Sequence, residues 1–196
     1  MGIRWLIGVL LCGIPFLPGC GPLTIKNEET GSYVPARRGT LELHEAVVIA
    51  TGRGRIFFQA GNLGFGGINE FEPHCELTVR TLTDEPQTIY ADTFMVERVS
   101  RDIRHVVKSR SVLLASLPEF RLATGDGGDG ESMQMHVYIM ELHSDEQPQV
   151  QYLVCGGAFN EPALARLPTL QDIAAALGRF GARVELQRDD IATRHP

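Results

Sequence analysis

The sequence contains little tryptophan and no surplus of positive charge, and each shortage narrows the possible functions. Its single tryptophan, Trp5, lies near the N-terminus, so the rest of the chain has no indole ring on which a sugar could stack. The 18 basic side chains are outnumbered by 24 acidic ones, which gives a net charge of -6. An acidic chain is repelled by nucleic acids and by anionic lipid head groups, so we expect neither as a general partner.

The sequence motifs of the common hydrolases are also missing. The chain has no G-x-S-x-G, H-E-x-x-H or S-x-x-K sequence. A catalytic nucleophile needs a base beside it and a third group that orients the base. His74 precedes Cys75, but neighbours on a strand project to opposite faces, which is poor geometry for proton transfer. We therefore assign no catalytic residue and no cofactor.

Long hydrophobic runs are absent too. Residues 5–17 form an apolar segment of about a dozen residues, preceded by Arg4. A membrane-spanning helix needs roughly 20 residues, whereas a short apolar run after a positive charge is typical of a signal peptide. No A-x-A-like triplet marks an ordinary signal-peptidase site, and the segment is followed by Cys20.

The sequence Leu17-Pro18-Gly19-Cys20 resembles the lipobox of bacterial lipoproteins, in which an apolar residue, two small residues and a cysteine mark the cut. Pro18 departs from the small residue usual at its position. The resemblance implies cleavage before Cys20 and attachment of fatty acyl chains, such as palmitate, to that cysteine. It also implies a periplasm-facing anchor in the outer membrane, because Gly21 is not the aspartate that favours retention in the inner membrane. An inner-membrane anchor or a soluble periplasmic protein is the alternative.

On this interpretation the chain has three parts. Residues 1–19 are a lipoprotein signal peptide, residues 20–38 a flexible tether from the lipidated cysteine, and residues 39–196 a single mainly β domain. The tether is inferred because GPLTIKNEETGSYVPARRG is polar, contains Gly and Pro, and has few apolar residues to bury. Its expected reach is about 25 Å. Within it, Arg37 and Arg38 either touch lipid phosphates or stay solvated.

Few cysteines are left after the predicted cut. Cys12 would leave with the signal peptide and Cys20 would carry lipid, so Cys75 and Cys155 are the two free thiols in an oxidising compartment. We expect a disulfide between them, which requires their Cα atoms to lie within about 7 Å. Their strands would then be adjacent in one sheet or face each other across the core. Two separate buried thiols are the alternative.

Short segments of alternating apolar and polar residues predict a mainly β fold. These segments are TLELHEAVVIA, RIFFQAG, EPHCELTVRTL, TIYADTFMVERV, SVLLASL, MQMHVYIMEL, VQYLVCGGAF and ARVEL. In EPHCELTVRTL the alternation places Cys75, Leu77 and Val79 on one face and Glu76 on the other. Residues 96–107 also fit a helix face, but their β-branched side chains favour a strand. So many short strands indicate an antiparallel sandwich or a small barrel.

One helix is predicted near the C-terminus, in LPTLQDIAAALGRFG. Thr169 would cap it, with Asp172 three residues later as in a capping box, and Gly178 or Gly181 would end it. Its apolar face would comprise Leu170, Ile173, Leu177 and Phe180. This segment, together with EPHCEL and YLVCGG, also resembles small proteobacterial lipoproteins of unassigned function, which implies no activity.

Two clusters contain side chains of the kinds that bind metal ions. MQMHVYIMELH contains thioether and imidazole groups of the kind that bind copper, namely Met133, Met135, His136, Met140 and His143. On a strand these residues alternate between two faces, so we favour core methionines and edge histidines, with no metal site. The stretch GDGGDGES carries Asp126, Asp129 and Glu131, but it lacks the spacing of a calcium-binding EF-hand, so we interpret it as a solvated loop.

The stretch ERVSRDIRHVVKSR is the one basic concentration on this acidic chain. We identify in it a possible patch for an anionic partner, made of Arg98, Arg101, Arg104, Lys108 and Arg110. Lipopolysaccharide phosphates or an acidic protein face would fit such a patch. The alternative is a solvated rim in which these residues pair with Glu97 and Asp102.

Together these features predict a lipid-anchored, periplasm-facing binding or assembly module of the bacterial envelope. Its partners would be the membrane, through lipidated Cys20, and an envelope protein, with no nucleic acid. The main alternative is a small β-barrel that carries or senses an apolar ligand such as a lipid. An enzyme with a site too dispersed to recognise from sequence is a third reading.

Overall fold

The computed structural model describes residues 23–64, 67–107 and 132–186. Its largest element is an antiparallel sheet of eight strands in the order β12-β3-β9-β10-β11-β7-β5-β6. In chain order these strands are β3 (Gly39–Leu43), β5 (Arg55–Gln59), β6 (Asn62–Gly64), β7 (His74–Val79), β9 (Asp92–Val107), β10 (Ser132–His143), β11 (Val150–Gly156) and β12 (Gly181–Leu186). Two separate pairs are β1 (Thr24–Lys26) with β2 (Tyr33–Pro35) and β4 (Val47–Ile49) with β8 (Gln87–Ile89).

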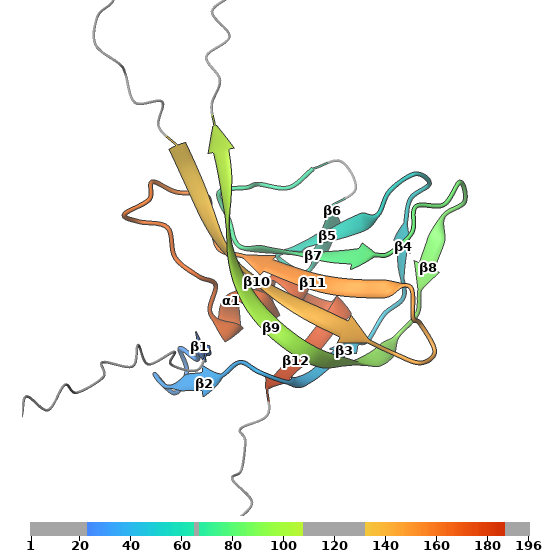
Figure 1. Ribbon diagram of the computed structural model, residues 1–196, viewed down its shortest axis with the longest axis horizontal. Helices are drawn as coiled ribbons and strands as arrows, with labels where there is room; N and C mark the ends of the chain where they lie inside the picture. The colour runs from blue at the N-terminus through green and yellow to red at the C-terminus, as the bar shows by residue number, and fades with distance from the viewer. Residues whose placement is uncertain (1–22, 65–66, 108–131, 187–196) are drawn as a thin grey trace, which may run out of the picture.

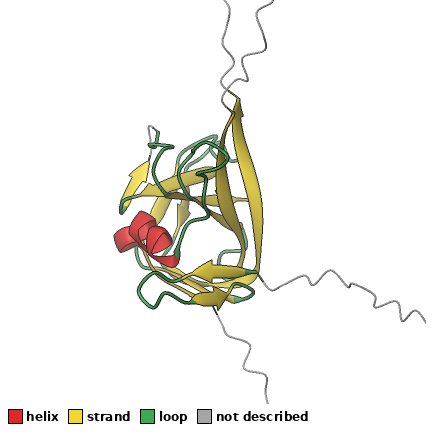
Figure 2. Cartoon of the chain, turned by 90° about the vertical axis from the view of Figure 1, so that its left-hand side faces the viewer, coloured by secondary structure: helices red, strands yellow, loops and turns green. Residues whose placement is uncertain are grey.

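The large sheet curls into a half-barrel, and one helix lies across its hollow side (Figure 1 and Figure 2). Helix α1 (Leu170–Leu177) contacts β12 at one edge of the sheet and β7 and β5 toward the other edge. We call the face that packs against α1 the inner face and the opposite one the outer face. The prediction of an antiparallel, mainly β fold with one C-terminal helix is therefore confirmed. Of the two predicted forms, sandwich or small barrel, the sheet resembles the barrel, but it curls only into a half-barrel.

The inner face carries the main hydrophobic core, because alternate residues of each strand point toward the helix. Phe58, Phe94 and Tyr138 from three strands are exposed by 2 % or less. Ile173 and Leu177 of α1 pack into the same cluster. Side chains therefore fill the interior of the half-barrel.

The segment predicted as a flexible tether contains a folded hairpin from Leu23 onward. β1 pairs with β2, and the Ala36 N–H donates to the Leu23 carbonyl at 2.7 Å. Ile25 and Ala36 are 0 % and 1 % exposed, and the Tyr138 hydroxyl donates to the Thr24 carbonyl at 3.0 Å. Burial raises the pKa of Tyr138, which keeps its hydroxyl protonated as a donor. The chain thus departs from the predicted tether, because two buried side chains and one phenol hold the hairpin on the half-barrel.

The stretch TLELHEAVVIA, predicted as one strand, forms two strands in different sheets. β3 ends at Leu43 and β4 begins at Val47. Between them the His44 N–H donates to the carbonyl of Phe180, in the short 3-10 turn η1 (Gly178–Phe180) after α1, at 2.8 Å. Both strands keep the predicted alternation of buried residues, but alternation alone does not reveal a change of sheet. Residues 96–107 belong to strand β9, so the prediction of a strand and not a helix is confirmed. The predicted strand SVLLASL lies outside the described residues.

Helix α1 has the predicted capping box. The Asp172 N–H donates to Thr169 Oγ1 at 3.1 Å, and the Thr169 N–H donates to the Asp172 carboxylate at 2.9 Å. Burial raises the pKa of Asp172, but hydrogen bonds from Arg166 and Thr169 outweigh this effect, so that the pKa lies below its ordinary value. The helix ends at Gly178, whose φ is 53°. Gly178 also lies against the backbone of Gly61, so that a Cβ at position 178 would collide with the Cα of Gly61.

A polar network joins the β10–β11 turn to the start of β9. Ser144 Oγ donates to the Asp92 carboxylate at 2.6 Å, and Gln147 Nε2 donates to the same carboxylate at 3.0 Å. The hydrogen bond from Ser144 lowers the pKa of Asp92; burial opposes it, and Gln147 and the Thr93 N–H reinforce it. The carboxylate form of Asp92 is therefore the one that this turn stabilises.

Candidate functional site on the outer face of the sheet

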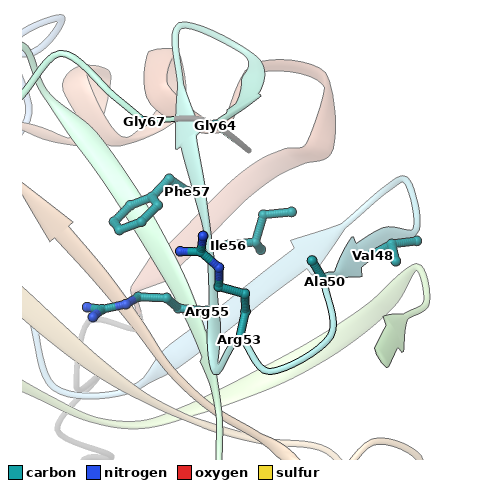
Figure 3. A pocket seen from close by; sticks show the side chains of 8 residues that line it. All are labelled: Val48, Ala50, Arg53, Arg55, Ile56, Phe57, Gly64 and Gly67. Atoms are coloured by element: carbon teal, nitrogen blue, oxygen red, sulfur yellow. The ribbon is translucent and has the colours of Figure 1, made fainter. Parts of the chain in front are cut away.

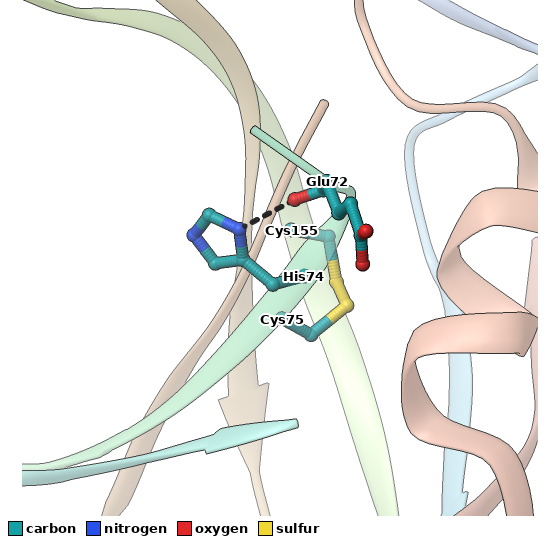
Figure 4. The surroundings of a disulfide bond; sticks show 4 residues. All are labelled: Glu72, His74, Cys75 and Cys155. Atoms are coloured by element: carbon teal, nitrogen blue, oxygen red, sulfur yellow. Dashed lines mark hydrogen bonds between the residues drawn. A yellow bond between two sulfur atoms is a disulfide. The ribbon is translucent and has the colours of Figure 1, made fainter. Parts of the chain in front are cut away.

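A disulfide joins Cys75 on β7 to Cys155 on β11, as predicted (Figure 4). The two residues are register partners with Cα atoms 4.1 Å apart, and both side chains are fully buried in the inner core. The bond holds two central strands in register. The next pair in this register is Glu76 with Val154, and because neighbours on a strand point to opposite faces, both lie on the outer face.

His74 also lies on the outer face, and its ring points away from the disulfide (Figure 4). Its Nδ1 donates to the Glu72 carbonyl at 3.0 Å, and its ring meets that of Phe57 edge-on at a centroid distance of 6.3 Å. The side chains of His74 and Cys75 lie on opposite faces of the sheet. This confirms the prediction that their geometry is poor for proton transfer. His74 is thus a packed neighbour of Glu76 on β7.

Glu76 on the outer face is a charged residue that is almost fully buried, with 3 % of its surface exposed. Its Oε1 lies 3.1 Å from Nη1 of Arg55 on β5, and its Oε2 lies 2.9 Å from Nη1 of Arg104 on β9. β10 and β11 separate β9 from β7 in the sheet, so Arg104 reaches over two strands to this carboxylate. We call Arg55, Glu76 and Arg104 the arginine–glutamate cluster.

The cluster gives each carboxylate oxygen a cationic partner. A buried carboxylate without partners would be strongly disfavoured, and here two guanidinium groups compensate its charge. Each guanidinium has five N–H donors, and the Arg55 and Arg104 side chains are still 56 % and 36 % exposed. The cluster therefore carries one net positive charge and presents further N–H donors to solvent.

A groove of about 420 Å³, which we call the outer groove, lies beside the cluster. Arg98 on β9 and Glu141 on β10 also line it, and their ion pair measures 2.9 Å. The full lining combines charged, hydroxyl and apolar groups, namely Glu76, Thr78, Arg98, Ser100, Arg104, Ile139, Glu141, Tyr152 and Val154. A ligand in this groove could make ionic, hydrogen-bonding and apolar contacts at once.

Arg55 lines a different groove, of about 220 Å³, near the β4–β5 turn (Figure 3). Its guanidinium lies 5.8 Å from the centre of the Phe57 ring, within the range of a cation–π contact. Arg53 extends from the turn into the same region. Phe57 on one side and Glu76 on the other thus hold Arg55, which lines this second groove and pairs with a residue that lines the outer groove.

The sheet divides the predicted anionic-partner patch. Arg98 and Arg104 line the outer groove. Arg101 lies on the opposite face of β9, where it is the register partner of Tyr138. Lys108 and Arg110 lie outside the described residues.

The ionic partners of this patch also differ from those named for a solvated rim. That alternative named Glu97 and Asp102, which are near in sequence, whereas Arg98 pairs with Glu141 and Arg104 with Glu76. Both observed partners belong to other strands of the sheet, so sequence proximity on β9 did not identify them.

Sequence reasoning missed Arg55 and the burial of Glu76. The alternation placed Glu76 correctly on the face opposite Cys75, but alternation does not indicate that a charged residue on that face is buried. Its burial depends on Arg55 and Arg104, which lie 21 and 28 residues away in the chain. We find no local sequence signal that identifies this cluster.

Within the ranges that the structure describes, no group of three His, Cys, Asp or Glu side chains could hold a metal ion. Met135 packs in a small outer-face cluster, whereas Met140 belongs to the inner core. His136 Nε2 is 3.1 Å from Gln134 Nε2, and His143 pairs with a carboxylate at 3.3 Å. The candidate copper ligands therefore alternate between the faces, as predicted for a strand.

Several predictions fall outside the described residues. These concern lipidated Cys20 and the acidic loop with Asp126, Asp129 and Glu131. In the parts of the chain that are described, none of the helices has the length and apolar character needed to cross a bilayer.

Comparison with known proteins gives no match: no family model, no curated protein and no solved structure is significantly similar to this chain.

Proposed function

We propose that this chain is a binding or assembly module of the bacterial envelope. Lipid at Cys20 would anchor it in the outer membrane, facing the periplasm, and the outer groove with the arginine–glutamate cluster would bind an acidic segment of an envelope protein. The single observation that carries the binding role is Glu76, a buried carboxylate that holds two partly exposed guanidinium groups in place.

Fixed arginines suit recognition of carboxylates. A mobile arginine loses side-chain entropy when it binds, and an arginine already held by a buried partner loses less. The planar guanidinium can also donate two parallel hydrogen bonds to one carboxylate. Arg55 and Arg104 are prepared in this way, since each uses Nη1 for Glu76 and is still substantially exposed.

The rest of the outer groove favours a peptide over a bare phosphate. Ile139 and Val154 supply apolar surface, and Ser100 and Tyr152 supply hydroxyl groups. Apolar surface contributes nothing to a phosphate but stabilises aliphatic side chains and the stems of glutamates. We therefore favour an acidic protein segment over lipopolysaccharide phosphates, which the sequence also allowed.

The filled interior favours the module over a carrier of an apolar ligand. Phe58, Phe94 and Tyr138 belong to the inner core with 2 % or less of their surface exposed. A lipid carrier needs an apolar cavity that holds most of its ligand. The outer groove, by contrast, is lined by residues on the opposite face of the sheet.

The binding role is tested with a fluorescein-labelled peptide of alternating glutamate and leucine, titrated by fluorescence anisotropy at low salt. We expect Arg104→Gln to weaken binding roughly tenfold, because a charged contact of this kind contributes about 1.4 kcal/mol or more. Arg101→Gln is the matched control: it removes the same charge from β9 but on the opposite face. Equal affinity of the two variants would refute the site.

The anchor is tested separately by Cys20→Ser. Without the thiol no acyl chain can be attached, so we expect the variant to be released from membranes or to accumulate as an uncut precursor. Membrane fractionation with mass measurement of the N-terminal peptide distinguishes these outcomes. A correctly cut variant that stays on the membrane would contradict the proposed lipidation.

A further inference from the structure

The folded part of the chain begins very close to the proposed anchor. Leu23 is fixed, because its carbonyl accepts the hydrogen bond from Ala36. Three peptide units join Leu23 to Cys20, and an extended residue spans at most about 3.6 Å, so their Cα atoms are within about 11 Å of each other. A tether of 19 residues would give the domain freedom to tumble, whereas this length does not.

Charge on the β1–β2 hairpin is distributed unevenly along its length. Arg37 and Arg38 are exposed and directly follow Ala36, the residue that pairs with Leu23, so they lie at the end near the anchor. Lys26 lies at the opposite end of the hairpin, where Glu28 and Glu29 in the turn give a net negative charge. Positive charge thus gathers where phosphate groups of a bilayer would be nearest.

We infer that the anchor end of the β1–β2 hairpin is a membrane-docking surface, held against phospholipid head groups with Arg38 in contact with their phosphates. This inference rests on the lipid anchor at Cys20 given under Proposed function. The consequence is a preferred orientation of the domain, in which β1 and β2 face the membrane. The C-terminal end of β9 and the N-terminal end of β10, at the top of Figure 1, then point away from it.

The chain offers its own reporters for this orientation. It contains only two lysines: Lys26 on β1, and Lys108 directly after the end of β9. Arg38→Lys adds a third amine next to the anchor while keeping the charge. The processed lipoprotein is reconstituted in vesicles of phosphatidylethanolamine and phosphatidylglycerol, treated with a membrane-impermeant acetylating ester, and mapped by mass spectrometry.

The matched control carries a 20-residue Gly-Ser spacer between Pro22 and Leu23, which gives an additional reach of about 25 Å. The measured quantity is the acetylation rate of each amine divided by that of Lys108. For the amine introduced by Arg38→Lys, we expect this ratio to be at least threefold lower in the native-length protein than in the spacer protein. The ratio for Lys26 should change in the same direction. Equal ratios in the two proteins would overturn the inference. Protection that persists with the spacer would also overturn it, because it would identify a protein contact.

Failure of the anchor is recognised independently in the same samples. Flotation with the vesicles and the acylated mass of the N-terminal peptide report lipidation at Cys20. A protein that floats and is acylated, yet shows unprotected amines near Leu23, keeps the anchor and refutes the docking surface.

Discussion

Reduction of the Cys75–Cys155 disulfide should destabilise the domain substantially. The bond closes a loop of 80 residues. In the chain-entropy model a loop of this length restricts the unfolded chain enough to stabilise the fold by about 4.5 kcal/mol. Measured values are commonly about 2–4 kcal/mol, and a domain of this size has only about 5–15 kcal/mol in total.

Reduction isolates this effect better than substitution does. Both cysteines are fully buried in the inner core, so Cys→Ala changes would also leave cavities. Reduced thiols keep nearly the same packing, because free cysteine behaves as a small apolar side chain.

The assay is urea denaturation followed by far-UV circular dichroism, with and without dithiothreitol. A loss of about 3 kcal/mol with a slope near 2 kcal/mol/M predicts a midpoint lower by roughly 1.5 M. Alkylation before and after reduction should recover zero and two free thiols, respectively, from Cys75 and Cys155. Coincident denaturation curves for fully reduced and fully oxidised protein would refute the entropic reasoning.

Three further substitutions test the packing of the fold, each by chemical denaturation. Asp92→Asn should lower the free energy of unfolding at pH 7 by about 1 kcal/mol, because Ser144 donates to the carboxylate. The pKa of Asp92 is lower in the folded protein than its ordinary value of 3.8. The difference in free energy of unfolding between wild type and variant should therefore have its full size above pH 3.8 and disappear as the pH falls through the folded pKa. A difference that grows in acid would contradict this prediction. Thr169→Ala should cost about 1 kcal/mol through loss of the helix cap, and Thr169→Ser should restore most of it. Gly178→Ala should cost at least about 2 kcal/mol more than Gly52→Ala, since both glycines have positive φ but only Gly178 abuts Gly61; equal costs would show that conformation alone decides.

Much of the fold could be predicted from local patterns. The alternation that places Cys75 and Leu77 inside and Glu76 outside depends only on strand geometry, and the Thr169–Asp172 capping box needs only four consecutive residues. The disulfide could be predicted from chemistry, because two thiols were left in an oxidising compartment.

The features that escaped prediction depend on distant residues. The β1–β2 hairpin is held by Tyr138, more than a hundred residues further along the chain, so its own composition looked like a linker. The burial of Glu76 requires Arg104 to reach over two strands, which follows from the strand order and the curl of the sheet. Neither strand order nor curl is encoded in the alternation of single strands.

The central claim, that the outer groove binds a protein partner, is tested most directly by site-specific photocrosslinking in cells. Benzoylphenylalanine replaces Ser100, which lines the groove, or Arg101, which lies on the opposite face of the same strand. We predict a discrete crosslinked protein adduct from position 100 that is absent from position 101 and that Arg104→Glu abolishes. No adduct at position 100, or equal adducts from both positions, would contradict the claim.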